Sequence, residues 1–514
     1  MLSSAILLLF LLPCACGENP AIQLILTNKG LQYGKHAGAG WVQDKLGSVT
    51  LPDLSGDFSL LIGSVHYTLS GISIEKCDFP EPSVEFFQNS TGLKASLSGL
   101  SVALTGEWTS SYGIIHDEGT FSMAVFNVDV LSVVELGRDA DGRLSLSSLL
   151  CEAHVQDVQI QIRGGASWII QLIVDHNRGR IRGDIESRIC PQMEEAIVEL
   201  ERHLQAVNVS FDVGEALSLD LPLSLPPVVS ASALSLGLKG EFYSIKTHKE
   251  PPFEAQPFTL PPQPGYMLSV GLSEFTLNSA FYGFFSSGLL QLLVDDGMIP
   301  PGSPVRLNTT SLGRYIPQLA QMFPDLLMNL QVYAREAPMF SLQPDAGKLS
   351  VEGTVKAFAI FPNGTQIPVF TLDSESLFSS KMRVADGRVK GSVTMDNLTL
   401  SLVASEVGPF STDSLEKMVR MGVKMVVLPK INQILASGIL LPRTKYGQLV
   451  NSVLTMEEVS MSEDVILLKT KPTLFELTSG SFLSGIHRLL FRRSAVSNRL
   501  TRALAIAVRT KTYF

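Results

Sequence analysis

A proline-rich strip in the middle of the chain is the feature that most limits how the sequence can fold. Residues 246–265 contain six prolines, more densely spaced than elsewhere in the chain. Proline lacks a backbone N–H and has a fixed φ, so this strip cannot form a helix interior or a central strand. We expect an extended linker that separates residues 18–245 from residues 266–470.

Each half opens with a pattern typical of an amphipathic helix. The spacing of apolar residues predicts one helix over 20–46 and another over 279–294. Polar and apolar residues then alternate, for example over 96–102 and 391–395. This period of two predicts half-buried β-strands, so an antiparallel sheet is expected in each half.

A longer helical stretch closes each half, over 168–204 in the first and 412–436 in the second. Each stretch includes an internal proline, Pro191 or Pro429, which predicts a kink. Helix, sheet and kinked helix thus occur twice, which indicates an internally duplicated α+β protein. One large mixed domain is the alternative, because the halves share too little sequence to establish the repeat.

The first 17 residues have the pattern of a secretory signal peptide. An apolar run is followed by Pro13 and by the small residues Ala15 and Gly17, although no Lys or Arg precedes the run. We interpret residues 1–17 as a cleaved signal, with a short buried helix as the alternative, and expect a secreted, extracellular protein. Five sequons are then candidate glycosylation sites: Asn89, Asn208, Asn308, Asn363 and Asn397.

The charge of the chain is unevenly distributed. Residues 18–245 carry 14 Lys and Arg against 28 Asp and Glu, a net charge of −14. Nucleic-acid binding requires a basic surface, so a nucleic-acid partner is not expected. The tail, residues 471–514, reverses the balance with 8 basic residues against Glu476 alone. We interpret this tail as an extension without a fixed fold, and the alternative is an amphipathic element that lies on an anionic membrane surface.

Motifs that carry catalysis or bind metals are missing from the sequence. It contains neither G-x-S-x-G nor H-E-x-x-H, and its eight histidines lack metal-ligand spacing. Residues 139–142 read DADG, but the glycine comes too early for a calcium loop, so we interpret them as a turn. We therefore expect no enzyme activity, no metal ion and no cofactor. A lipid hydrolase with unusual motif spacing is the least favoured alternative.

A series of short motifs extends across about residues 18–470. The motifs occupy residues 27–33 (TNKGLQY), 51–53 (LPD), 240–243 (GEFY), 271–275 (GLSEF), 295–300 (DDGMIP), 407–410 (VGPF), 428–432 (LPKIN) and 440–442 (LLP). Each motif alone is weak, but the ordered series resembles the family of bactericidal/permeability-increasing and lipopolysaccharide-binding proteins.

The resemblance implies a boomerang of two pseudo-symmetric barrels, each of twisted antiparallel sheet and long helices, joined by a central sheet. Each barrel would hold an apolar pocket for phospholipid acyl chains. The implied function is a secreted, monomeric protein of innate defence that binds phospholipid and bacterial lipopolysaccharide through lipid A, with peripheral membrane contact. The alternative is a phospholipid transfer carrier without microbial recognition. The alternative to these pockets is that the apolar helix faces pack against the sheets as a filled core.

The resemblance also implies a disulfide between Cys151 and Cys190, while we expect Cys77 to be buried and inert. The hairpin over 106–118 has three acidic residues and no Lys or Arg, unlike cationic relatives, which argues against electrostatic killing of bacteria. The remaining cations proposed to contact lipid A phosphates are Lys45, Lys94, Arg178, Arg180 and Arg182. For the three arginines, a solvated face partly paired with Asp175, Asp184 and Glu186 is the favoured alternative. The residues proposed from periodicity to line the lipid pockets are Ile22, Leu24, Ile25, Trp168, Ile169 and Leu172 in the first half, and Phe281, Phe285, Leu289 and Met425 in the second.

Overall fold

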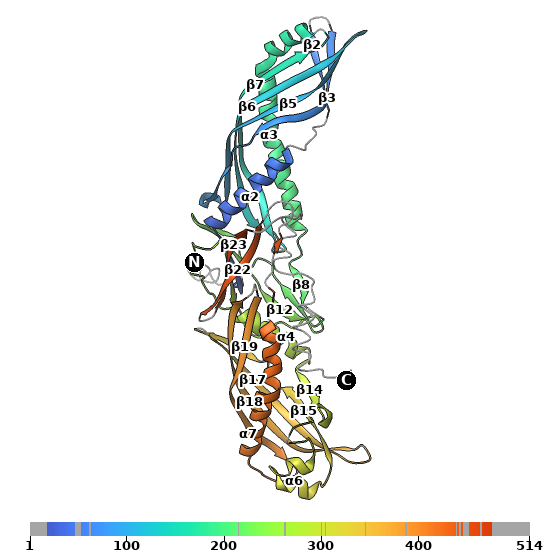
Figure 1. Cartoon of the computed structure of the whole chain (residues 1–514), viewed down its shortest axis with the longest axis vertical. Coiled ribbons are helices and arrows are strands. Elements are labelled where there is room, and N and C mark those ends of the chain that lie inside the picture. Colours follow the sequence, from blue (N-terminus) through green and yellow to red (C-terminus); the bar gives the residue numbers. More distant parts are fainter. Residues whose placement is uncertain are drawn as a thin grey trace, which may run out of the picture.

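The computed structural model shows an elongated α+β molecule with two lobes arranged end to end on either side of a central sheet (Figure 1). Long helices pack on twisted antiparallel sheets, which confirms the predicted fold class. The structure describes residues 18–474, apart from 47–52, 61–62, 166, 214, 262–263, 300, 304, 345, 386–387, 438, 441–443, 446–451 and 463–464. The signal peptide and nearly all of the basic tail, as predicted from the sequence, lie outside the described residues.

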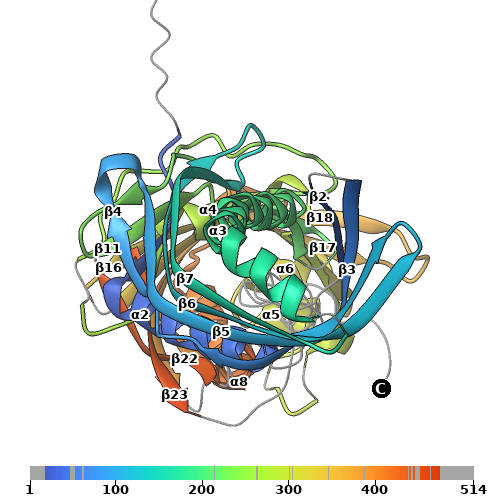
Figure 2. The same ribbon diagram turned by 90° about the horizontal axis from the view of Figure 1, so that it is seen from above.

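The first lobe is built on an antiparallel sheet with strand order β2-β3-β5-β6-β7, and β4 pairs with β5. Register shifts interrupt the pairing of β5 with β6, and such bulges bend and twist strands. Figure 2 shows these strands curving around the long helix α3. The elements are β2 (Leu54–Leu60), β3 (Gly63–Asp78), β4 (Ser83–Phe87), the 3-10 helix η1 (Gln88–Ser90), β5 (Gly92–Tyr112), β6 (Ile115–Arg138) and β7 (Leu144–Arg163).

Helix α3 (Ser167–Gln205) covers this sheet and agrees closely with the helix predicted over 168–204. Ile181, Ile185 and Ile189 recur every four residues and therefore lie on one side of the helix. They pack against Val155 and Val158 of β7, both fully buried. The helix continues through Pro191.

The central sheet has the order β10-β11-β1-β13-β23-β22-β21, so it joins segments from the beginning, middle and end of the described chain. Strand β1 (Ile22–Thr27) lies between β11 and β13. A single helix over 20–46 was therefore a wrong prediction: its first part is this strand, and helix α2 (Asn28–Leu46) follows. The other strands are β10 (Val228–Val229), β11 (Ala233–Leu238), β13 (Leu268–Ser273), β21 (Thr444–Lys445), β22 (Ser452–Ser462) and β23 (Val465–Leu474).

The proline-rich strip runs between a small three-stranded sheet and the central sheet. Among the described residues between β12 and β13, none belongs to a helix or strand. The strip is nevertheless attached to β1, because Gln23 Nε2 donates to the carbonyl of Phe258 at 2.6 Å. The small sheet has the order β12-β9-β8, with β8 (Ser210–Val213), β9 (Leu217–Asp220) and β12 (Glu241–Ser244).

The second lobe has a sheet of order β14-β15-β17-β18-β19-β20, with β16 paired to β17. The strands are β14 (Gln291–Val294), β15 (Leu327–Ala334), β16 (Met339–Gln343), β17 (Ala346–Ile360), β18 (Gln366–Ala385), β19 (Arg388–Ser405) and β20 (Ile439–Leu440). Short helices lie between β14 and β15: η2 (Asp296–Met298), α5 (Thr309–Leu312) and α6 (Pro317–Met322).

The helix predicted over 279–294 is displaced and shorter in the structure. Helix α4 (Glu274–Ser286) ends before Gly288, whose φ of +74° is a left-handed conformation that stops helices, and β14 follows. Leu289 consequently lies outside the helix. Helix α4 is fixed to β16 by the buried Asn278, whose side chain accepts from Phe340 N at 2.7 Å and donates to Phe340 O at 2.9 Å.

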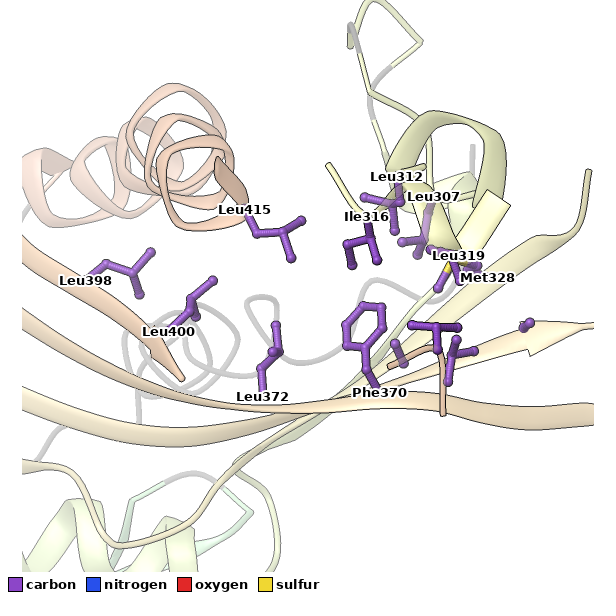
Figure 3. Packing of buried hydrophobic residues seen from close by; sticks show 14 of the residues in the cluster. Leu307, Leu312, Ile316, Leu319, Met328, Phe370, Leu372, Leu398, Leu400 and Leu415 are labelled. Atoms are coloured by element: carbon purple, nitrogen blue, oxygen red, sulfur yellow. The ribbon is translucent and has the colours of Figure 1, made fainter. Parts of the chain in front are cut away.

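The helical stretch predicted over 412–436 consists of three joined segments: α7 (Asp413–Gly422), the π-helical turn η3 (Val423–Val427) and α8 (Leu428–Ser437). The π turn ends two residues before Pro429, whose missing N–H and bulky ring disturb the hydrogen bonding of the helix four residues earlier, within the turn. Figure 3 shows Leu415 of α7 and Ile316 facing Leu372 and Leu400 of the sheet. These residues belong to the largest buried cluster of the second lobe.

Candidate functional site

The start of α3 presents large apolar side chains to solvent. Trp168 is 70% exposed and Leu172 is 64% exposed. Ile170, between them, packs against a buried cluster that includes Trp108 and Phe121. Since successive helical residues rotate by about 100°, Trp168 and Leu172 share the side of α3 opposite Ile170 and face away from the sheet. The side chain of Ile169 lies outside the described residues.

The other first-half pocket candidates lie in β1. The predicted helical face of Ile22, Leu24 and Ile25 does not exist, because neighbouring residues of a strand point to opposite sides of the sheet. Ile22 and Leu24 pack in a cluster with Val270. Ile25 packs on the other side against the linker, with Phe258 and Leu260.

Of the four pocket candidates in the second lobe, two pack against other residues and two are exposed. Phe281 packs against Phe340 and Leu342, and Phe285 lies 6.5 Å from Tyr282 between ring centroids. Leu289 and Met425, by contrast, are exposed, with Met425 at 70% on the π-helical turn.

The end of the first lobe carries a row of polar side chains across four strands. Asp57 of β2 pairs with His66 of β3, His66 with Ser111 of β5, and Ser111 with His116 of β6. Residues directly opposite in a sheet share one face, and the His66 ring contacts the Asp57 carboxylate. A concavity of about 540 Å³ lies here, lined by His66, Thr68, Thr109, Ser110, Ser111, His116, Asp117 and Glu118.

A second concavity of about 500 Å³ lies where α2 begins, near β4. Its lining includes Asn28, Gln32, Glu85 and Asn89. Polar side chains thus line much of both concavities, although Val84, Phe86 and Ala231 also line the second. Hydroxyl, amide and carboxyl groups suit ligands that form hydrogen bonds.

The four described cations among those proposed to contact phosphates do not form one site. Lys94 Nζ lies 3.1 Å from the carboxylate of Glu85, at the end of β5 away from the hairpin turn. The turn is 18 residues further along β5, which corresponds to about 60 Å. The Lys45 side chain lies outside the described residues.

The three candidate arginines lie on the middle of α3. Arg178 lies 3.5 Å from Asp175, and Arg182 donates to the carbonyl of Gln156 at 3.5 Å. Arg178 and Arg182 share one side of the helix, whereas Arg180 points to the opposite side. All three are exposed, so they could contact anions but do not converge on one point.

Cys151 of β7 and Cys190 of α3 form a disulfide, with their Cα atoms 5.7 Å apart. The bridge ties the long helix to the sheet it covers. Cys77 of β3 is a free thiol that is half-buried, not buried as predicted. Burial, together with the neighbouring Asp78 carboxylate, raises the pKa of the Cys77 thiol and so favours its unreactive protonated form.

The candidate glycosylation sites differ in their surroundings. Asn89, Asn208 and Asn363 are exposed. Asn308 is half-buried and caps α5, accepting a hydrogen bond from Ser311 N at 2.7 Å. Asn397 is exposed on β19 and accepts from Arg420 at 3.1 Å. The first three are therefore the most open attachment points.

The described part of the chain contains neither a cluster of three or more metal-ligating side chains nor a helix long and apolar enough to span a membrane.

The apex of the hairpin between β5 and β6 was not predicted from the sequence. Ile114 is 96% exposed and Ile115 is 63% exposed, next to Gly113 with a φ of +58°. Turns normally carry polar residues, so two isoleucines beside the turn glycine of Tyr112-Gly113-Ile114-Ile115 were the available signal. Without the turn position, the same letters are consistent with a buried strand.

Comparison with known proteins covers both lobes. The LBP / BPI / CETP family model for the N-terminal domain matches residues 30–203, and the model for the C-terminal domain matches residues 212–465. A bactericidal permeability-increasing protein from Sebastes schlegelii is 35% identical over 465 residues, covering 90% of this chain and 97% of the relative. A lipopolysaccharide-binding protein from Bos taurus is 28% identical, covering 86% of this chain and 92% of the relative.

One solved structure shows the same fold. The crystal structure of lipopolysaccharide binding protein aligns with a TM-score of 0.52 and 24% sequence identity. The alignment covers 89% of this chain and 100% of that chain.

Proposed function

The chain belongs to the LBP / BPI / CETP family, and we propose that it is a secreted lipid-binding protein of innate defence that binds phospholipid and recognises bacterial lipopolysaccharide. The observation that carries this proposal is the match to a bactericidal permeability-increasing protein over 90% of the chain. Relatives named as lipopolysaccharide-binding proteins match both lobes as well. The resemblance therefore extends to the two-lobed protein rather than to one domain.

We assign lipid contact to apolar side chains that remain accessible. In the first lobe these are Trp168 and Leu172, and in the second lobe Leu289 and Met425. Ile22 and Phe281 already pack against other core residues and have little surface left for an acyl chain. Apolar burial contributes about 25 cal/mol per Å², so a few such side chains are sufficient to bind acyl chains.

Recognition of lipopolysaccharide then depends mainly on its acyl chains. Residues 106–118, the hairpin at the end of the first lobe, contain no Lys or Arg, so the exposed α3 arginines are the described candidates for phosphate contact. Exposed ionic contacts are screened by salt, whereas apolar contacts are not. We therefore expect binding that changes little between 50 mM and 500 mM NaCl.

The test is lipid analysis of the protein secreted by cultured animal cells. Mass spectrometry of extracted lipid is expected to find phospholipid, and fluorescent lipopolysaccharide should bind and compete with it. Trp168→Ser combined with Leu172→Ser should weaken binding, whereas Val228→Ser combined with Val403→Ser, at exposed positions elsewhere, should not. The proposal would be contradicted if the secreted chain carried no lipid and did not bind lipopolysaccharide. If it transferred phospholipid between vesicles without binding lipopolysaccharide, it would instead be a transfer carrier.

A further inference from the structure

Gln171, near the start of α3, binds the open edge of the first-lobe sheet. Its side-chain oxygen accepts from Ile162 N and its amide nitrogen donates to Ile160 O, each at 2.9 Å. The same nitrogen donates to Asp175 at 3.0 Å, so the half-buried side chain uses both of its amide hydrogens. Strand β7 ends the strand order and α3 lies along it (Figure 2), so Gln171 occupies the place of a further strand.

The second half of α3 is fixed to β7 more firmly. The disulfide between Cys151 and Cys190 joins the strand to the helix covalently. Glu186 accepts a hydrogen bond from Val155 N at 2.8 Å, and Ile185 packs in the same buried cluster as this valine. This half of the helix therefore cannot leave the strand while the disulfide is intact.

Glycines lie on both sides of the first half of α3, residues 167–178, which we call the flap. Gly179 and Gly183 follow it inside the helix, where a Cβ on either residue would meet nothing within 4 Å. Glycine weakens a helix interior relative to alanine, because its backbone gains more freedom when the helix opens. Gly164 and Gly165 form the turn before the helix, and both have positive φ. The flap is thus bracketed by two glycine pairs that can act as hinges.

The flap covers apolar surface of the first lobe. Ile170 on the flap and Ile162 on β7 both pack against the buried Trp108 and Phe121. The concavities of about 540 and 500 Å³ are lined largely by polar side chains and supply little surface for an acyl chain. Outward movement of the flap would expose apolar surface between α3 and β7.

A similar amide contact recurs in the second lobe. Asn432 of α8 accepts from Val393 N at 2.7 Å and donates to Val393 O at 2.9 Å. Val393 lies past the two residues of β19 that pair with β20. The π-helical turn η3 precedes α8, and such turns interrupt the regular hydrogen bonding of a helix. Binding of a helix to a sheet edge through one amide side chain, next to an irregular helical segment, is therefore common to both lobes.

We propose that the flap is a gate for acyl chains: release of Gln171 from β7 lets residues 167–178 swing outward about the glycine hinges and admits a chain between α3 and the sheet. The inference rests on the proposed lipid-binding function and adds the route by which lipid enters the first lobe. Water can replace both hydrogen bonds of Gln171 when the flap opens, and an acyl chain can replace the apolar contacts of Ile170. The disulfide holds the rest of the helix, so the flap returns to the same position.

The test is the rate at which the full secreted chain, loaded with pyrene-labelled phosphatidylcholine, exchanges this lipid for unlabelled phosphatidylcholine. Gln171→Leu should raise the rate about tenfold, because it removes both hydrogen bonds to β7 and keeps a side chain of similar size. The matched control is Gln192→Leu, the same substitution at an exposed position of α3 beyond the disulfide, which should exchange like the parent. Equal rates for Gln171→Leu and the parent would overturn the proposal.

Hydrogen exchange followed by mass spectrometry shows which segment moves. Gln171→Leu should speed the exchange of amides in residues 167–178 and leave residues 185–203 unchanged. Faster amide exchange in the flap without faster lipid exchange would overturn the gate, because the flap would then open without admitting lipid.

A second variant keeps the test decisive if Gln171→Leu folds poorly. Gly179→Ala combined with Gly183→Ala favours the continuous helix and should slow lipid exchange about threefold. Faster or unchanged lipid exchange in this variant would contradict the hinge. A parent chain that binds neither phosphatidylcholine nor lipopolysaccharide contradicts the proposed function, whereas a lipid-loaded chain whose exchange rate is insensitive to these substitutions contradicts the gate alone.

Discussion

Trp108 of β5 donates its indole N–H to the backbone carbonyl of Arg163, at the end of β7, over 3.1 Å. The indole is buried, and the same carbonyl lies beside Gly119 of β6. This bond joins the hairpin strand to the turn that begins α3. It therefore ties β5, which leads to the hairpin apex at Ile114, to the end of β7, which precedes Trp168 and α3.

Trp108→Phe should destabilise the first lobe by about 1–2 kcal/mol. The substitution keeps an aromatic ring at a buried position but removes the indole N–H and its hydrogen bond to the carbonyl of Arg163. Loss of one such hydrogen bond costs about 0.5–1.5 kcal/mol, and the smaller ring also loses packing contacts. Urea-induced unfolding measures the change. Trp168→Phe is the matched control because Trp168 is exposed, and it should change the free energy of unfolding by less than about 0.5 kcal/mol. Equal effects of the two substitutions would contradict this role of the indole.

Glycine substitutions in the same lobe should have opposite effects. A Cβ on Gly119 would lie 2.0 Å from Arg163 O, a backbone atom that cannot move aside, so Gly119→Ala should cost about 2–3 kcal/mol. A Cβ on Gly179 of α3 meets nothing within 4 Å, so Gly179→Ala should stabilise the chain by about 0.5–1 kcal/mol. Thermal unfolding of both variants tests the pair, and a stabilising Gly119→Ala would refute the close approach.

Long periodic segments could be predicted from the sequence, whereas long-range pairing could not. Helix α3 was predicted to within one residue at each end because its apolar spacing persists over ten turns. Strand β1 was merged with α2, because its six residues are stabilised by β11 and β13, more than 200 residues away. The sequence of residues 22–27 alone does not show that they pair with strands so far away in the chain.

The candidate site was less predictable for a related reason. The spacing of apolar residues marks a helix such as α3 but does not show which of its sides meets the sheet, so Trp168 could not be distinguished from Ile170. Likewise, the pairing of Lys94 with Glu85 depends on the register of β4 against β5. Only the folded sheet shows that this lysine lies far from the hairpin apex.

Removal of the disulfide should lower the free energy of unfolding by about 4 kcal/mol. Cys151 and Cys190 close a loop of 39 residues, and opening it increases the conformational entropy of the unfolded chain. Urea-induced unfolding of the variant with Ser at both positions measures the loss. Cys77→Ser, at a free half-buried thiol, is the control and should cost less than about 1 kcal/mol. A loss below 1 kcal/mol in the double variant would contradict the constraint.

Asp296 should make the stability of the second lobe depend on pH. Its carboxylate contacts Arg306 and accepts a hydrogen bond from Leu307 N at 2.7 Å. The hydrogen bond from Arg306 is the main reason that the pKa of Asp296 lies below its ordinary value. A lowered carboxyl pKa stabilises the fold above the unfolded pKa of about 4, and this stabilisation disappears as the pH falls through the folded-state pKa.

Asp296→Asn should therefore cost about 1–3 kcal/mol at pH 7, because it removes charge-assisted hydrogen bonds. The difference between parent and variant should shrink as the pH is lowered from 5 to 3, since protonation removes the same charge from the parent. Urea-induced unfolding across this range measures the difference. Asp212→Asn, at an exposed position, is the control and should show a small difference at every pH. A constant difference between parent and Asp296→Asn from pH 7 to pH 3 would show that the carboxylate charge does not stabilise this loop.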